Sequence, residues 1–271
     1  MTTQKKSFKD LDLADDFLFA KVMSDMEICR KVLEKILNIP ISKVTVPATQ
    51  KTIDILYESK GIRLDVYVGD EKGTVYNVEM QQKHKKELPK RARYYQGNID
   101  LDLISSGAEY NALKKTYIIF ICTFDPFDEK RHIYTFENRC LENLSLSLGD
   151  EATKIFLSTK GKLDDINDEL KELLAYVETT TDEFAINSSS ELIKKIHKKV
   201  TEVKLSKKME VEYMTLYMRD MENREEGREE GQARMAALTE HLLEENRTDD
   251  LKRALKDIVF RNELFEQYGI I

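Results

Sequence analysis

The sequence predicts an α/β domain followed by an all-helical region. Segments with strand-like alternation recur in the first part of the chain, with helix-like segments between them. From Leu163 onward there is no proline, glycine is scarce and the spacing of apolar residues is helical. A chain of 271 residues can hold one α/β domain of about 150 residues plus a helical remainder. We expect four parts: a core over 1–160, a helical extension over 161–222, a charged helical arm over 223–232 and a small helical module over 233–271.

The composition is that of a soluble globular protein, with 41% hydrophobic and 34% charged residues. No apolar run approaches the roughly 20 residues that a membrane span needs, and the amino terminus lacks the apolar stretch of a signal peptide. The three cysteines show no C-x-x-C spacing, and the four histidines are scattered, which argues against a zinc site. These features predict a cytoplasmic protein without a membrane segment.

The first elements follow from periodicity. Apolar residues at helical spacing predict a helix over about 13–38, which ends before Pro40. Residues 50–57 are expected to form a strand, and 62–81 a β-hairpin.

The next helix is expected from Pro89, in its first turn, to Ser106, with Gly107 as a left-handed stop. The strand expected over 116–124 would return to the sheet parallel to the hairpin's second strand, because a helix connects them. Two further strands are predicted over 131–136 and 153–158.

The hairpin carries polar residues on one face of each strand. If it closes symmetrically over Gly69 to Gly73, Asp65 lies opposite Asn77, and Glu79 is a diagonal neighbour about 7–8 Å away. Two carboxylates about 6 Å apart repel by roughly 3 kcal/mol at an effective dielectric constant near 20. A divalent cation such as Mg²⁺ or Mn²⁺ would relieve this repulsion. The alternative is a half-exposed strand pair with an acidic solvent face, and spacing alone favours neither.

A basic run follows the hairpin, in a chain whose net charge is −7. Six of the thirteen residues from 83 to 95 are lysine or arginine. Such a run is often only a solvated surface, but beside a metal site it is better interpreted as a grip for a polyanion. Basic side chains neutralise phosphates and aromatic rings stack on bases. The candidate nucleic-acid contacts are Lys83, Lys85, Lys86, Lys90, Arg91, Arg93, Tyr94 and Tyr95.

The order of these elements resembles the PD-(D/E)XK nuclease core. More closely, the chain resembles the bacterial Rpn family of recombination-promoting nucleases or transposases, over roughly residues 10 to 235. The resemblance implies a restriction-endonuclease-like fold, in which helices flank a mixed sheet and an all-helical region follows. Its blocks begin at Asp15-Asp16-Phe-Leu-Phe and include Gly61-Ile-Arg-Leu-Asp65, Tyr76-Asn-Val-Glu79-Met-Gln81, Leu88-Pro-Lys-Arg-Ala-Arg-Tyr-Tyr95 and Tyr134-Thr-Phe-Glu-Asn-Arg139.

The resemblance assigns roles to the site residues. Asp65 and Glu79 match the two acidic half-motifs and would be catalytic metal ligands, and Gln81 stands where the motif has lysine. An amide cannot take a proton, so Gln81 would orient water or a phosphate oxygen by hydrogen bonds. Lys83 could supply the missing positive charge. Asp16 is either a further metal ligand or the N-cap of the first helix.

The function expected is that of a metal-dependent DNA endonuclease of low sequence specificity, with Mg²⁺ as cofactor and Mn²⁺ as a substitute. It would aid recombination, mobile-element or defence processes. Three alternatives stay open: a catalytically weak nucleic-acid-binding or assembly protein, an RNA substrate, and an interaction scaffold whose helical half is the functional part.

The helical region suggests self-association. Residues 193–205 alternate apolar and basic positions, which fits a surface helix or a second contact with DNA backbone. The repeated R-E-E-G over 223–232 predicts a flexible arm, because each glycine costs a helix about 1 kcal/mol. Beyond it we expect two short helices, with a break at Asn246–Asp249 and a cap at Thr248 or Asp249. Their apolar residues predict a homo-oligomer: Leu238, Leu242, Leu243, Leu251, Leu255, Ile258 and Leu264.

Overall fold

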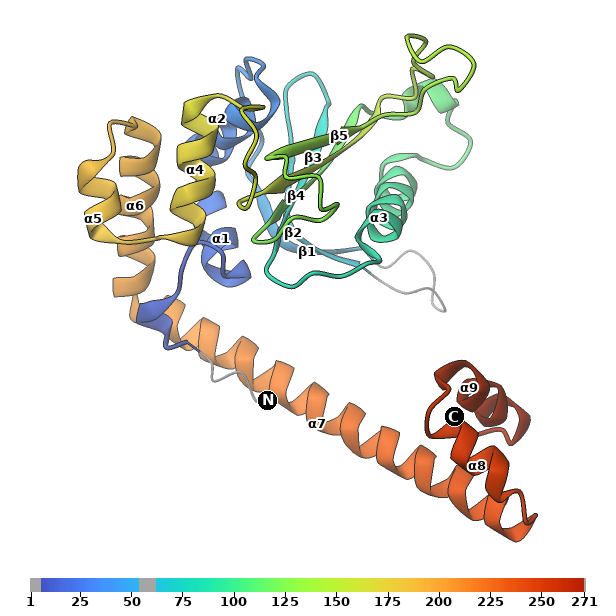
Figure 1. The fold of residues 1–271 in the computed structure, drawn as a ribbon. Helices are drawn as coiled ribbons and strands as arrows, with labels where there is room; N and C mark the ends of the chain where they lie inside the picture. Colours follow the sequence, from blue (N-terminus) through green and yellow to red (C-terminus); the bar gives the residue numbers. More distant parts are fainter. Residues whose placement is uncertain (1–5, 54–61, 271) are drawn as a thin grey trace. The chain divides into compact units, whose positions relative to one another are not determined.

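The computed structural model describes residues 6–53 and 62–270, and within them one mixed sheet is flanked by helices (Figure 1). The strand order is β1-β2-β3-β4-β6-β5, in which β3, β4 and β6 are parallel and the other pairs are antiparallel. The expected α/β domain, with a mixed sheet flanked by helices and a helical region after it, is thereby confirmed. The strands are β1 Ala48–Ile53, β2 Ile62–Gly69, β3 Val75–Gln81, β4 Thr116–Cys122, β5 Ile133–Phe136 and β6 Ala152–Ser158.

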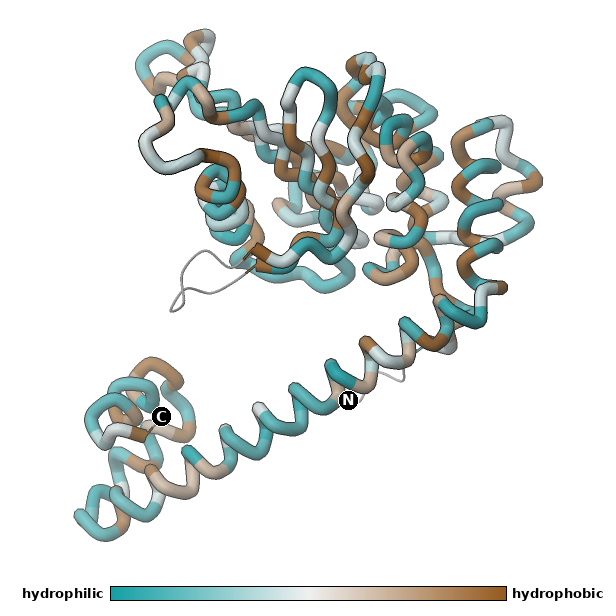
Figure 2. The backbone as a smooth tube through the Cα atoms, turned by 180° about the vertical axis from the view of Figure 1, so that it is seen from behind, coloured by the Kyte–Doolittle hydropathy of each residue, from teal (hydrophilic) through white to brown (hydrophobic). Residues whose placement is uncertain are grey.

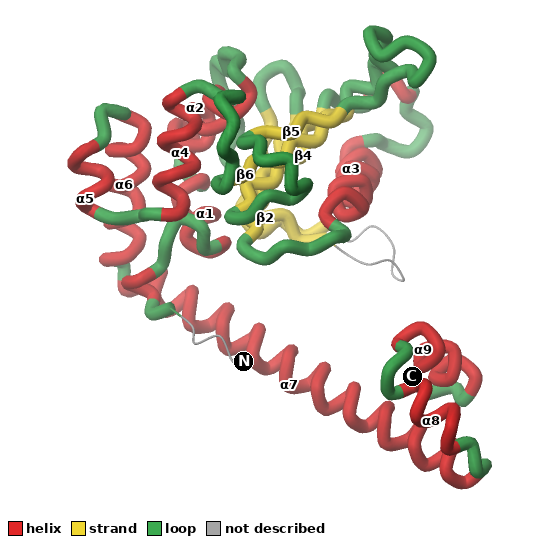
Figure 3. Tube along the Cα trace, in the orientation of Figure 1, coloured by secondary structure: helices red, strands yellow, loops and turns green. Residues whose placement is uncertain are grey.

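Helices cover both faces of the sheet. One face carries α3, and the other carries α1, α2, α4 and α6, with α5 against α6 (Figure 3). Short 3-10 helices span Phe8–Asp10 and Tyr110–Ala112. The α-helices are α1 Asp16–Met23, α2 Met26–Leu37, α3 Leu88–Leu103, α4 Asp168–Glu178, α5 Asp182–Asn187, α6 Glu191–Leu205, α7 Lys207–Glu244, α8 Thr248–Ala254 and α9 Ile258–Gln267.

The β2–β3 turn sets the register of the site. The Asp70 carboxylate accepts hydrogen bonds from the backbone N–H groups of Lys72 and Thr74, each at 2.9 Å, and Gly73 supplies the positive φ of 83° that the turn needs. Thr74 therefore belongs to the turn, and Gly69 pairs with Val75.

The expected opposition of Asp65 and Asn77 is consequently wrong. Asn77 lies opposite Tyr67, and continuing this register places Asp65 directly opposite Glu79. The register differs from the expected one by two residues, so every side chain stays on its predicted face of the sheet. The two acids still share a face and are closer neighbours than the diagonal arrangement would make them.

Two predicted helix boundaries are also wrong. The segment 13–38 forms two helices, because the Asp25 side chain accepts hydrogen bonds from the backbone of Glu27 and Ile28 and caps a new one. Helix α3 ends at Leu103, and the left-handed Gly107 lies in the turn beyond it. Strand β1 starts at Ala48, and the predicted strand positions 54–57 lie outside the described residues.

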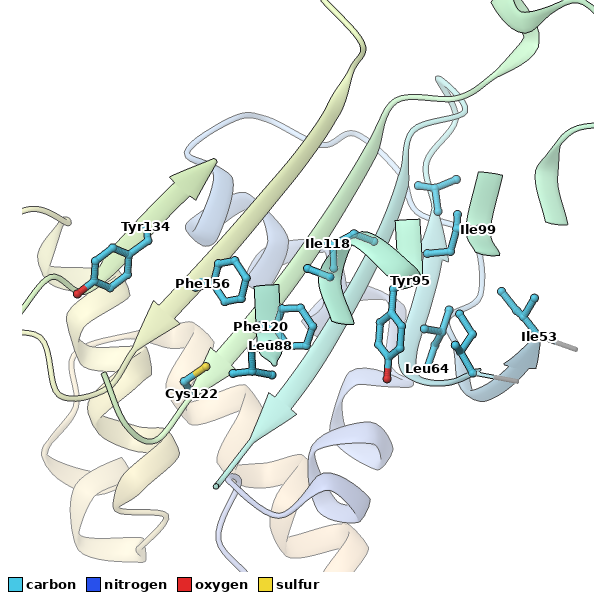
Figure 4. Packing of buried hydrophobic residues seen from close by; sticks show 13 residues of the cluster. Ile53, Leu64, Leu88, Tyr95, Ile99, Ile118, Phe120, Cys122, Tyr134 and Phe156 are labelled. Carbon is cyan, nitrogen blue, oxygen red and sulfur yellow. The ribbon is translucent and has the colours of Figure 1, made fainter. Parts of the chain in front are cut away.

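The main core on the α3 side holds this helix against the sheet. Leu88, Tyr95 and Ile99 recur at helical spacing and are buried. They pack against side chains of β4 and β6, including Phe120 and Phe156, whose rings stack with centroids 5.2 Å apart (Figure 4). The first turn of α3, where Leu88 and Pro89 begin the helix, is thereby fixed next to the end of β3.

The chain divides into two compact units, Met1–Lys207 and Lys208–Ile271. The second unit is helical, and the R-E-E-G repeats lie inside the continuous helix α7, whose middle is mostly hydrophilic (Figure 2). Among the described residues, nothing lies within 4 Å of a Cβ added at Gly227 or Gly231, so neither glycine packs closely against another part of this chain. The four-part division at 160, 222 and 232 stays a prediction.

The end of the second unit has one more helix than expected. The last turns of α7 pack with α8 and α9 around a small core of Leu238, Leu242, Ala254, Leu264 and Phe265. The predicted cap at Thr248 or Asp249 is wrong, since both lie within α8. Instead Asp257 caps α9 by accepting hydrogen bonds from the backbone of Val259 and Phe260.

Candidate metal and nucleic-acid site

Two acidic side chains meet across strands β2 and β3. The backbone N–H of Asp65 donates to Glu79 Oε1 at 3.1 Å, and the backbone N–H of Met80 donates to Asp65 Oδ2 at 3.1 Å. Glu79 is fully buried, whereas Asp65 keeps partial exposure. The hairpin therefore brings together the two carboxylates that the sequence singled out.

Burial and neighbouring negative charge disfavour ionisation of both carboxyl groups, a cost that a bound cation would offset. Burial raises the pKa of Glu79, and the charge of Asp65 raises it further. Burial likewise raises the pKa of Asp65, with a smaller contribution from Asp16. Carboxylate oxygens are the donors that Mg²⁺ and Mn²⁺ prefer, so the donor set suits such an ion. Among the described residues, no three His, Cys, Asp or Glu side chains form a ready metal cluster.

Asp16 lies near the pair without capping its helix. The cap of α1 is Asp15, whose side chain accepts hydrogen bonds from the backbone of Phe17 and Leu18, so the N-cap alternative for Asp16 is wrong. Asp16 is exposed at the first position of α1, close enough to raise the pKa of Asp65. Gln82 donates to the Ala14 carbonyl at 2.7 Å and ties the end of β3 to the start of α1. A metal-ligand role for Asp16 stays a prediction.

Arg91 occupies the position between the acid pair and Gln81. Its Nη2 donates to Glu79 Oε2 at 3.2 Å, and its Nη1 donates to Gln81 Oε1 at 3.1 Å. The sequence placed Arg91 among the surface contacts for nucleic acid. The signal that could have found its inward position is the spacing from Leu88 to Arg91, Ala92 and Tyr95, which puts Arg91 at the border of the helix's apolar face.

Two further expectations for the basic run need correction. Strand β3 ends at Gln81, so Lys83 does not continue its polar face as expected, and its role as the missing positive charge stays a prediction. Tyr95 is only 6% exposed and stacks on Phe120 with centroids 6.2 Å apart, so it is not available to bases. Tyr94 is 39% exposed. The other basic residues of the run are exposed, namely Lys85, Lys86, Lys90 and Arg93.

A mixed sheet that brings an aspartate together with an E-x-Q strand end, beside the amino terminus of a helix, has the architecture of PD-(D/E)XK nucleases. The family described as PD-(D/E)XK nuclease family transposase matches residues 12–226, and the chain belongs to this family. The resemblance drawn from the sequence is thereby confirmed. No curated protein and no solved structure is significantly similar to the chain.

Family membership supports a nuclease, and therefore a hydrolase, with DNA as the suggested partner. Nucleases of this class generally use divalent metal ions. In the part of the chain that the structure describes, no helix is both long and apolar enough to cross a membrane.

We predict that the exposed lysines grip nucleic acid. Replacing Lys85, Lys86 and Lys90 with glutamine should weaken DNA binding about equally for all sequences and reduce the slope of log affinity against log salt by about one unit per lost phosphate contact. Fluorescence anisotropy over a salt series measures both quantities. Lys194 and Lys198 are exposed on α6, and replacing both with glutamine tests whether this helix makes a second contact with the DNA backbone. Parental affinity and slope in the triple variant would show that the run is only a solvated surface.

Proposed function

We propose that the protein is a Mg²⁺-dependent endodeoxyribonuclease of low sequence specificity. The observation that carries the proposal is the pairing of the partly exposed Asp65 with the fully buried Glu79 near the Gln81 amide. Such a pair costs stability unless a cation compensates it, which is the arrangement expected of a site that takes up a divalent metal ion.

Each residue has a part in this proposal. Asp65 and Glu79 would hold the cation, with Asp16 close by. When bound, the cation lowers the pKa of water and stabilises developing charge on the phosphate. The Gln81 amide can hold a water molecule or a phosphate oxygen by a hydrogen bond but cannot accept a proton.

The surroundings favour a nucleic-acid backbone over single bases. The first turn of α3, at its amino terminus, presents the positive end of the helix dipole, which attracts phosphate. The exposed Lys85, Lys86 and Lys90 precede or enter the same turn. Phosphate contacts fix position without reading sequence, which accounts for the proposed low specificity. A nuclease of this kind would serve recombination, mobile-element or defence processes.

The test is incubation of the purified protein with supercoiled plasmid in Mg²⁺, Mn²⁺, Ca²⁺ or chelator. We expect nicked and then linear DNA with Mg²⁺ or Mn²⁺ and intact plasmid with chelator. Duplex and single-stranded RNA in parallel reactions show which sugar is accepted, because phosphate contacts do not distinguish them. Plasmid that stays intact while gel mobility shows binding would favour the nucleic-acid-binding or assembly alternative.

We further propose that the residues after about 211 drive self-association. Leu238, Leu242 and Leu264 are buried within the second unit, but Leu255 and Ile258 remain 61% exposed. A nuclease with one site per chain needs two copies to cut both strands, and a two-fold dimer supplies them. Exposed apolar residues of this kind are candidates for the contact between copies.

We therefore predict that truncation near Asn223 gives a folded core of smaller sedimentation coefficient, which loses double-strand cutting before nicking. Analytical ultracentrifugation and plasmid assays measure the two effects. Glutamate at Leu255 and Ile258 is the matched full-length variant and should dissociate the oligomer without truncation. A parent that is monomeric at micromolar concentration, or a truncation with unchanged oligomeric state, would contradict this prediction.

A further inference from the structure

The guanidinium group of Arg91 is held from several directions. Besides its bonds to Glu79 and Gln81, its Nε donates to the Tyr95 hydroxyl at 2.7 Å. Its carbon lies 5.0 Å from the centroid of the Tyr95 ring and 5.9 Å from that of Phe120. Favourable contacts with ring faces add to the hydrogen bonds. An arginine without a role in the site would not be expected to have a hydrogen-bond partner for each of its three guanidinium nitrogens.

Arg91 and a metal ion would compete for the same carboxylate. Glu79 Oε1 is engaged by the backbone of Asp65, and Oε2 faces Arg91. Carboxylate oxygens bind Mg²⁺ at about 2.0–2.1 Å, so an ion on Oε2 would lie within about 5 Å of the guanidinium. A divalent and a monovalent cation about 5 Å apart repel each other strongly. The contact between Arg91 and Glu79 therefore opposes metal binding.

The side chain of Arg91 has enough access to solvent to move out of this position. Its side chain is 28% exposed, whereas Glu79 is fully buried, so the guanidinium lies at the solvent edge of the site. Its neighbours on α3, Lys90 and Arg93, are exposed. A planar guanidinium pairs with phosphate through two parallel hydrogen bonds, a geometry that the ammonium group of lysine lacks.

We propose that Arg91 is an exchangeable counter-ion of the site. In the free protein it neutralises Glu79 and occupies the Gln81 carbonyl oxygen. When a divalent cation takes over Glu79, the guanidinium turns to a phosphate of the nucleic-acid strand, and Gln81 is released for a water molecule or phosphate oxygen. This inference rests on the proposed nuclease function, because it assumes that the cation and the strand meet at this site.

The exchange makes the two ligands cooperative. A cation that displaces Arg91 makes the guanidinium available to phosphate, and a phosphate that captures Arg91 removes a competitor for Glu79. Coupling of this kind is reciprocal and is typically about 5- to 150-fold in affinity. A fixed structural role for Arg91 predicts no such coupling.

The first measurement is calorimetric titration of the full chain with Mn²⁺ alone. Arg91→Gln should bind Mn²⁺ at least about tenfold more tightly than the parent, a free-energy difference of about 1.4 kcal/mol. Arg91→Lys keeps the charge and should bind Mn²⁺ as the parent does. Arg30→Gln is the matched control, because Arg30 is 26% exposed and pairs with Glu34 at 2.8 Å on the opposite side of the sheet. Its Mn²⁺ affinity should equal that of the parent.

The second measurement is binding of a phosphorothioate duplex with and without Mn²⁺. Mn²⁺ should tighten duplex binding by the parent and by Arg30→Gln, and this gain should disappear in Arg91→Gln. Parental Mn²⁺ affinity in Arg91→Gln, or a retained gain, would overturn the inference. Its failure is distinct from that of the proposed function, which fails if the parent leaves plasmid intact at saturating Mn²⁺. Absence of Mn²⁺ binding by every variant would overturn both.

Discussion

Replacing Asp65 with alanine is expected to abolish DNA cleavage and leave the fold intact. Asp65 and Glu79 are the two carboxylates that the hairpin brings together, and a cation held by one of them alone would lose much of its binding energy. The loss should exceed the effect of changing any positioning group at the site. Plasmid nicking in Mg²⁺ and in Mn²⁺ measures it, and we expect activity below detection in both.

The stability of the same variant separates a metal site from a structural one. Burial, and to a smaller extent the charge of Asp16, raise the pKa of Asp65, so its ionised form is disfavoured in metal-free protein. Removing the carboxylate relieves this repulsion but leaves the Met80 N–H without its side-chain acceptor, which costs about 1 kcal/mol. The two effects oppose each other, so we expect little change in melting temperature without metal.

Asp65→Asn is the sharper variant, because its carbonyl can still accept from Met80. In chelator, Asp65→Asn should be at least as stable as the parent, and it should not cleave DNA. Asp100→Asn is the control: Asp100 is also a partly buried acid with a raised pKa, but its partner is Gln96 on α3. That variant should cleave normally. An unchanged nicking rate in Asp65→Ala would refute the metal-site assignment.

The sequence sufficed to predict which side chains share the polar face of the hairpin. Parity along a strand is a local property, and the face of Asp65 and Glu79 survives any register shift of two residues. The register itself depends on whether Thr74 belongs to the turn, which a single side-chain oxygen of Asp70 decides. Symmetry about the two glycines could not reveal that contact.

The inward position of Arg91 was hard to predict from the sequence for a different reason. Lys90, Arg91 and Arg93 are chemically alike, and only the rotation of α3 on the sheet decides which one faces inward. That rotation is set by Leu88, Tyr95 and Ile99, which dock on β4 and β6, residues far away in the chain. The same docking buries Tyr95, which the local run of basic and aromatic residues presented as a surface side chain.

Gln81 is the second residue from which we expect a large effect. Its side chain is 8% exposed, and its amide oxygen accepts a hydrogen bond from Arg91. Since an amide has no titratable group, its contribution must be to position water, phosphate or Arg91 itself. Gln81→Ala should therefore lose roughly 10²-fold or more in cleavage rate, the scale seen when one positioned polar group is removed from a site.

Gln81→Lys should retain measurable activity, because lysine occupies this position in the motif of the superfamily. Its ammonium would meet the guanidinium of Arg91, so we expect Arg91 to move toward solvent in this variant. Gln96→Ala is the control, because Gln96 is also 8% exposed but bonds to Asp100 on its own helix. Single-turnover cleavage at saturating metal gives the rates. If Gln81→Ala cleaves as fast as the parent, the amide has a structural role only, and the site works through its two carboxylates and the surrounding basic groups.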